Sequence, residues 1–220
     1  MLQEEINMKN GVIIALLIGL IVLTILIILW WDKWRRKAIT EAGKSLGFHR
    51  LAQGETLPVV LVPLINPTKN KYFLILRGEI NGYEAGFFDL FIGAGKNWFY
   101  QSTVIVKNPQ VTMPKFQLKS SDWSHVITQR TCGDELKIPG REKDMHSLRL
   151  SSDDPQWALQ TFSRATPQFF QKLQKGKWTI EGFQHSLVVY RWGQTISPRK
   201  LQEYVKQAAE IATEMYALCS

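Results

Sequence analysis

An uncharged apolar run of 20 residues, Val12 to Trp31, lies near the N-terminus, and Thr24 is its only hydroxyl. As a helix rising about 1.5 Å per residue, it would extend about 30 Å, which is the thickness of a bilayer hydrocarbon core. A cleaved secretory signal would have basic residues before the run and a small-residue cleavage site after it. Here the basic residues follow the run, and "ILWWDKW" offers no such site. We therefore predict an uncleaved transmembrane helix.

The charges beside this run predict its orientation, because basic residues near a span stay on the cytoplasmic side. Lys9 is the only basic residue before the run, and Glu4 and Glu5 accompany it. We expect a single-pass protein of the cell membrane, which in a bacterium is the inner membrane. Its N-terminus would lie outside and its C-terminal domain in the cytoplasm. Tryptophans favour the headgroup region, as basic residues do on the cytoplasmic side. The predicted membrane-interface residues are Trp30, Trp31, Lys33, Trp34, Arg35, Arg36 and Lys37.

Small residues recur every four positions at the start of the run, at Gly11, Ala15 and Gly19. Such a face lets two helix backbones approach closely in lipid, so it predicts homo-oligomers formed through the membrane helix. The alternative is that glycine and alanine are simply common in membrane helices.

The rest of the chain is basic and has room for one domain of ordinary size. The whole chain carries a net charge of +8, and residues 32–220 contain 26 basic and 17 acidic side chains, a balance of +9. A basic surface favours an anionic partner, either lipid or nucleic acid. The sequence has no RNA-recognition or zinc-finger signature. We therefore expect the membrane lipid surface to be a partner and nucleic acid not to be one.

Four segments are predicted along the chain. After the span, Trp34, Ala38, Ala42 and Leu46 repeat every four residues, which indicates that the helix continues until glycines end it. The segments are a short extracytoplasmic tail (1–11), the transmembrane helix (12–31), a basic juxtamembrane helix (32–47) and a cytoplasmic α+β domain (48–220).

Hairpin patterns predict an antiparallel sheet in the domain. In "YFLILRGEINGYEAGFFDLF", residues 72–91, two apolar runs flank Asn81-Gly82, the pair that favours a two-residue type I′ turn. Residues 98–109 add a third strand, and "KFQLK" after Pro114 adds a short fourth.

The remaining segments are less regular. Residues 57–65 contain two prolines and indicate an edge strand or a linker. Residues 119–146 are rich in turn residues and are expected to be mostly irregular, before a brief strand at "HSLRL". Residues 177–193 read as a second hairpin, turning around Gly182.

Three helices are predicted to start in the same way, with a capping side chain followed by proline. The pairs are Asp154-Pro155, Thr166-Pro167 and Ser197-Pro198. The last helix has an apolar stripe about three positions wide per heptad, which favours packing on a sheet over a coiled-coil seam. The stripe contains Leu201, Tyr204, Val205, Ala208, Ile211, Ala212, Met215, Leu218 and Cys219.

The sequence contains no clear catalytic or metal-binding constellation, and no cofactor is expected. His49, His125, His146 and His185 lack paired spacing, so each is read as an isolated histidine. The loop "HVITQRTCGDE" places His125, Cys132 and Asp134 within ten residues, so a thiol nucleophile with a nearby base could be drawn, but such partners normally meet through the fold. "GAGK", residues 93–96, lacks the spacing of a phosphate loop and is read as a loop between strands.

The ordered motifs resemble a group of bacterial proteins of unknown function. They are "RGEINGYEAGFFDLF", "STVIVKNP", "MPKFQL", "LRLSSDDPQWA" and "SLVVYRWG" before a terminal helix, and they cover roughly residues 72–216. The resemblance implies an N-terminal membrane segment followed by one sheet-rich cytoplasmic domain, and it implies no catalytic residues.

These observations predict a membrane-tethered cytoplasmic interaction or scaffold module rather than an enzyme. Its expected partners are the lipid surface and another membrane or cytoplasmic protein. Two alternatives stay open. One is a membrane-associated enzyme with a site near the 119–146 loop. The other is a domain that binds a lipid or other amphiphile between the sheet and the last helix.

Overall fold

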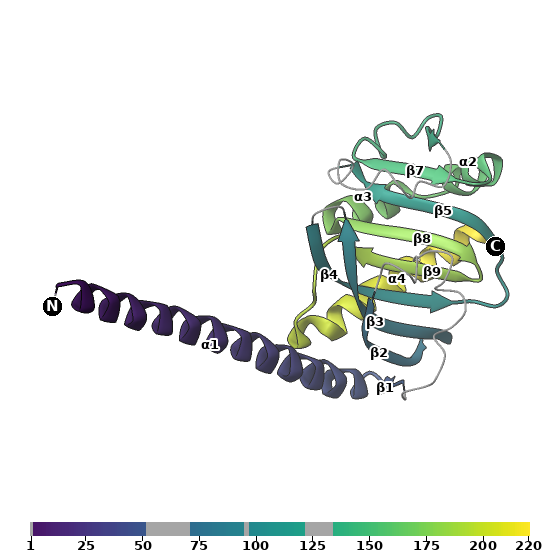
Figure 1. The fold of residues 1–220 in the computed structure, drawn as a ribbon. Coiled ribbons are helices and arrows are strands. Elements are labelled where there is room, and N and C mark those ends of the chain that lie inside the picture. The colour runs from purple at the N-terminus through teal and green to yellow at the C-terminus, as the bar shows by residue number, and fades with distance from the viewer. Residues whose placement is uncertain (1, 52–70, 95–96, 122–133) are drawn as a thin grey trace.

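The computed structural model describes residues 2–51, 71–94, 97–121 and 134–220 (Figure 1). This part of the chain contains four α-helices and a nine-stranded sheet, which confirms the predicted α+β class. The helices are α1 (Leu2–Lys44), α2 (Pro155–Ser163), α3 (Pro167–Gly176) and α4 (Leu201–Cys219), and a 3-10 helix, η3, spans Pro198–Lys200. The strands are β1 (His49–Arg50), β2 (Lys71–Ile80), β3 (Tyr83–Ala94), β4 (Asn97–Lys107), β5 (Met113–Ser120), β6 (Glu135–Leu136), β7 (Leu148–Ser152), β8 (Trp178–Gln184) and β9 (Ser186–Arg191).

The strands form one sheet in the order β1-β2-β3-β4-β9-β8-β5-β7-β6, and all neighbouring pairs are antiparallel. Figure 1 shows α4 lying along the sheet, with α1 leaving the domain as one long rod. The β5 strand inserts between β8 and β7, so the sheet is not a simple run of hairpins.

One face of the sheet forms the main core with α2, α3 and α4. Leu118, Leu150 and Ile180 from three neighbouring strands are fully buried there, as are Ala208 and Ile211 from α4. This burial confirms that the last helix packs on the sheet. A smaller buried cluster lies on the other face, and it contains Phe88, Leu90, Ile105, Val188 and Tyr190.

The first predicted hairpin is confirmed. Asn81 and Gly82 both have positive φ, at 53° and 80°, and Ile80 pairs with Tyr83 across the turn. These angles are those of a type I′ turn, whose twist matches the two strands. At the other end of β3, Gly93 and Ala94 of "GAGK" pair with Trp98 and Asn97, so these two residues belong to the strand and not to a loop, and residues 95–96 lie outside the described residues.

The second hairpin is present, but its predicted turn at Gly182 is wrong. Phe183 pairs with Ser186, so the turn residues are Gln184 and His185, and Gln184 has the positive φ of 53°. Gly182 lies within β8, where a Cβ would stand 2.1 Å from Phe116 Cε1. The glycine is therefore explained by the close approach of the Phe116 ring, not by a turn.

Two of the three predicted helix starts carry the expected cap. Asp154 Oδ1 accepts a hydrogen bond from Trp157 N at 2.9 Å, and Thr166 Oγ1 accepts one from Phe169 N at 3.2 Å. Ser197 makes no such bond, because Pro198 opens the short 3-10 helix before α4 begins. Residues 57–65, and residues 122–133 of the irregular segment, lie outside the described residues.

Candidate functional site

A candidate membrane span is visible in α1. Between Leu16 and Lys44 the helix has an 18-residue window with a mean hydropathy of 2.2, and none of that window is buried within the protein. Large apolar side chains such as Leu16 and Leu29 are more than half exposed. By length and composition this stretch can cross a membrane, although no bilayer is present in the structure. An exposed apolar surface of this length is typical of a helix that contacts lipid.

The same helix continues into the domain without a break. Ile39 is fully buried, and Ala42 packs against the main core. This part of α1 contacts β1, β2, η3 and α4. The predicted juxtamembrane helix is therefore part of the folded domain, and Gly47, with a φ of 77°, turns the chain after it.

A buried ion pair joins α1 to the sheet. The Arg35 guanidinium pairs with the Asp89 carboxylate of β3, and the two side chains are 17% and 3% exposed. Arg35 Nη2 also donates a hydrogen bond to the Ile196 carbonyl at 2.9 Å. Ser102 Oγ donates to Asp89 Oδ1 at 2.6 Å and accepts from Ile196 N at 2.9 Å. We call Arg35, Asp89, Ser102 and Ile196 the anchor joint.

Helix α4 also contacts the anchor joint. Tyr204 Oη donates a hydrogen bond to the Ser102 carbonyl at 2.8 Å. Burial raises the pKa of the Tyr204 hydroxyl well above its usual range, so it remains a donor throughout the physiological range. The joint therefore connects α1, β3, β4 and α4 through one set of polar contacts.

The predicted membrane-interface residues do not all face outwards. Trp30, Trp31 and Trp34 are exposed, and the rings of Trp31 and Trp34 lie 5.2 Å apart. Lys33 and Lys37 are also exposed. Arg36 is half-buried and pairs with Asp32 one turn earlier at 2.6 Å. Arg35 differs from the others, because its charge is directed into the domain.

The predicted helix-association face is described only in part. Gly19 lies on the exposed span, and a Cβ there would meet nothing within 4 Å. The side chains of residues 2–15, which include Gly11 and Ala15, lie outside the described residues.

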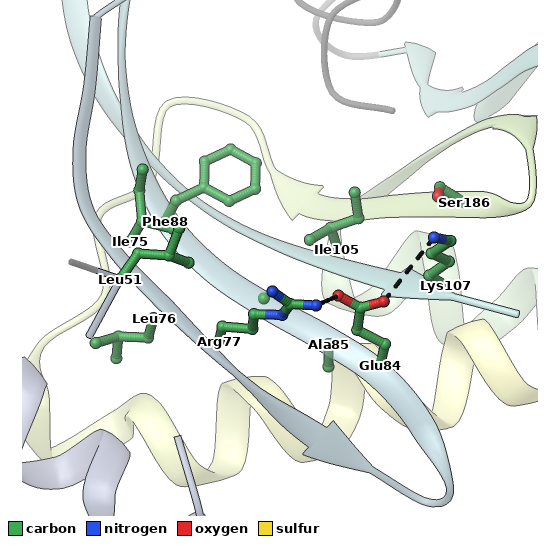
Figure 2. A pocket seen from close by; sticks show the side chains of 11 residues that line it. Leu51, Ile75, Leu76, Arg77, Glu84, Ala85, Phe88, Ile105, Lys107 and Ser186 are labelled. Atoms are coloured by element: carbon green, nitrogen blue, oxygen red, sulfur yellow. Dashed lines mark ion pairs between the residues drawn. The ribbon is translucent and has the colours of Figure 1, made fainter. Parts of the chain in front are cut away.

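A small hollow lies on the sheet face opposite α4 (Figure 2). Leu51, Ile75 and Phe88 line one end, as Figure 2 shows, and the other end carries the charged side chains. The Glu84 carboxylate forms ion pairs with Arg77 at 2.6 Å and with Lys107 at 3.9 Å. The enclosed volume is about 20 Å³, which is room for about one water molecule.

The hydroxyl of Ser186 is an unusual polar group in the lining of this hollow. Ser186 lines the hollow and is 1% exposed, and its Oγ has no hydrogen-bond partner among the described residues. A buried hydroxyl without a partner is uncommon and costs free energy, so it calls for an explanation.

The histidine and cysteine candidates for catalysis are not brought together in the described part of the chain. His146 Nδ1 lies 3.0 Å from the Lys143 carbonyl, and His185 Nδ1 lies 2.8 Å from the Val111 carbonyl. His49 is exposed on β1 and Asp134 is exposed, whereas His125 and Cys132, the other members of the thiol-and-base candidate, lie outside the described residues. Among the described residues no group of three metal-ligating side chains gathers.

The other cysteine, Cys219, is half-buried on α4, and burial raises the pKa of its thiol to about 11. A thiol with a raised pKa is a weak nucleophile at neutral pH.

The sequence analysis did not predict the anchor joint, although "FFDLF" contains a signal for it: Asp89 is a lone charge inside an apolar strand.

No protein-family model and no curated protein matches this chain. A solved structure does: the mycobacterial trehalose monomycolate transport factor A, TtfA, with a TM-score of 0.55 and 11% sequence identity. The match covers 83% of this chain and 93% of the TtfA chain. At this identity the likeness shows a shared fold and no more.

Proposed function

We propose that this protein is a single-pass membrane module that acts by contact and whose domain is held in one orientation at the bilayer surface. The observation that carries the proposal is the continuity of α1, which runs unbroken from the exposed apolar span into the anchor joint. In this proposal the N-terminus lies outside and the domain lies in the cytoplasm.

The joint supports a scaffold role because it leaves no flexible linker between bilayer and domain. Arg35 lies only one residue after Trp34, the last exposed tryptophan of the helix. At about 1.5 Å per residue, the domain therefore begins within a few ångströms of the headgroup region. A domain placed in this way suits binding to a lipid surface or to a neighbouring membrane protein.

The exposed basic residues strengthen this placement. Lys33 and Lys37 point outwards from α1, and each basic residue near an anionic leaflet contributes about 1 kcal/mol. The partner is the lipid surface together with another membrane or cytoplasmic protein, or a second copy of this chain through Gly11, Ala15 and Gly19.

The proposed orientation is tested with a reporter fused after Ser220 in the full chain. A fluorescent protein that folds only in the cytoplasm should be active there, and an alkaline phosphatase fusion should be inactive. The variant Lys33→Gln/Arg36→Gln/Lys37→Gln should weaken this orientation, while Lys33→Arg/Lys37→Arg keeps the charge and serves as the control. Arg35 is left intact because it belongs to the anchor joint. A reporter active only outside would contradict the proposal.

A second candidate function is binding of an amphiphile at the hollow, on the face opposite the one expected from the sequence. The unpartnered Ser186 hydroxyl favours it, together with the apolar lining and the rim cations Arg77 and Lys107. The name of TtfA, a transport factor for trehalose monomycolate, is consistent with it. Because the enclosed space is small, a bound chain would lie along the open part of the hollow.

This second candidate is tested with a photoactivatable palmitate and the full chain in nanodiscs. Crosslinks should map to the hollow, and Lys107→Gln should reduce them several-fold. Lys115→Gln, a lysine on β5 outside the hollow lining, is the control and should leave them unchanged. Crosslinks spread evenly over the domain would argue against the site. The enzyme alternative depends on the 119–146 loop, of which residues 122–133 lie outside the described residues.

A further inference from the structure

We propose that the segment 192–200, together with the exposed lysines of α1, forms a second contact with the anionic headgroups of the bilayer that α1 spans. This inference rests on the proposed membrane function. It assigns lipid contact to a second segment, which is far from α1 in the sequence. The segment comprises the turn after β9 and the 3-10 helix η3.

The structure places this segment against the membrane anchor. Arg35 Nη2 donates to the Ile196 carbonyl at 2.9 Å, and η3 contacts α1 directly. Figure 1 shows the start of α4, next to η3, beside α1 at the point where the helix leaves the domain. Because Arg35 follows Trp34 directly, the segment lies within about one to two helix turns of the tryptophan-rich end of the span.

The segment is also held in place by the sheet. Ser102 N donates to the Gln194 carbonyl at 2.8 Å, and Gln194 N donates to the Arg191 carbonyl at 3.2 Å. Gly193 has a φ of 64°, which supports the tight turn there. The surface is therefore presented by a fixed backbone.

The charge at this end of the domain is positive. Arg199 and Lys200 of η3 are exposed, as are Lys33 and Lys37 of α1. Glu203, an exposed acid in the first turn of α4, follows Lys200 by three residues. Asp32 is paired with Arg36, and Asp89 with Arg35, so neither cancels these four charges. A cationic rim beside a membrane helix fits an anionic lipid leaflet, where each basic residue strengthens binding roughly fivefold.

The test uses the full chain in nanodiscs, with an environment-sensitive fluorophore at Gln194→Cys in a Cys132→Ser/Cys219→Ala background. A matched label at Asp153→Cys, an exposed position just before α2, is the control. A headgroup spin-labelled lipid should quench the Gln194 label several-fold more than the Asp153 label. The difference should grow when phosphatidylglycerol replaces phosphatidylcholine, and it should shrink at high salt.

The variant Arg199→Gln/Lys200→Gln should lower the quenching at Gln194 several-fold while the chain stays inserted. Equal quenching at the two labels, or quenching that ignores lipid charge, would overturn the inference. Insertion is measured separately by resistance to alkaline carbonate extraction. A chain that is extracted would overturn the proposed membrane function itself, so the two failures can be distinguished.

Discussion

Asp89 shows how one residue fixes the relation between anchor and domain. The residue is buried within β3, and its carboxylate is compensated by Arg35 and by the Ser102 hydroxyl. A buried charge is tolerated only when it is paired and hydrogen-bonded. Arg35 is thus required by the fold, whereas the exposed Lys33 and Lys37 can contact the lipid surface that we propose as a partner.

We predict that Arg35→Met destabilises the full chain by about 3 kcal/mol, because it leaves the Asp89 carboxylate buried without its cation. Arg36→Gln is the matched control. It removes only a half-exposed pair within one helix, and it should cost no more than about 0.5 kcal/mol. Urea unfolding in detergent micelles, followed by near-ultraviolet circular dichroism, measures both.

The double variant Arg35→Met/Asp89→Leu distinguishes a buried ion pair from simple loss of packing. Removing both charges should recover much of the lost stability, since no unpaired carboxylate remains. If the double variant is as unstable as Arg35→Met, the charge of Asp89 is not the cause.

At the scale of elements, much of the local structure follows from the sequence. The Asn81-Gly82 turn and the caps at Asp154 and Thr166 depend on neighbouring residues alone, so their signals are readable. The turn at Gln184 was predicted at the wrong residue because Gly182 was taken as a turn glycine. A glycine is needed at 182 because the Phe116 ring packs against it, and this tertiary contact leaves no pattern in the local sequence. The insertion of β5 between β8 and β7 is also non-local.

The three residues that precede the helix-starting prolines should differ in their contribution to the stability of the domain. Asp154→Ala and Thr166→Ala should each cost about 1 kcal/mol, because each removes a hydrogen bond to a helix N-terminal amide. Ser197→Ala should change stability by less than about 0.5 kcal/mol, since this serine makes no cap bond. The same urea titration measures all three, and an equal cost for Ser197→Ala would contradict the assignment.

Helix α4 should make the domain sensitive to alkali. Burial raises the pKa of Tyr216, whose hydroxyl donates to the Val106 carbonyl at 2.7 Å, and raises the pKa of Cys219 to about 11. Both groups hold their protons more tightly in the folded state. Stability is therefore complete below their unfolded pKa values, about 8.5 for cysteine and 10 for tyrosine, and falls as the pH rises above them.

The measurement is the unfolding free energy between pH 7 and pH 11. It should be flat near neutrality and should decline from about pH 8.5. Cys219→Ala should remove part of the decline below pH 10, and Tyr216→Phe should reduce the decline above it. A curve that rises over this range would show that other groups dominate.

At the scale of the whole molecule, the anchor and the domain form one body. The apolar span was predictable from composition, because lipid imposes a length and an absence of charge. The inward direction of Arg35 was not, because a basic residue after a span has the same local pattern whether it faces lipid headgroups or a buried carboxylate. Only the packing of α1 against η3, β2 and α4 separates these two environments.

This arrangement predicts a narrow range of distances between the span and the domain. Spin labels at Ile27→Cys, exposed on α1, and at Gln202→Cys, exposed on α4, should give one sharp peak by pulsed dipolar spectroscopy in nanodiscs. The labels require the Cys132→Ser/Cys219→Ala background. Adding Arg35→Met should broaden the peak, because the joint that aligns the helix is lost, whereas Arg36→Gln should leave it sharp. A broad distribution in the parent chain would mean that the domain moves freely on its anchor, and the scaffold role would then lose its structural basis.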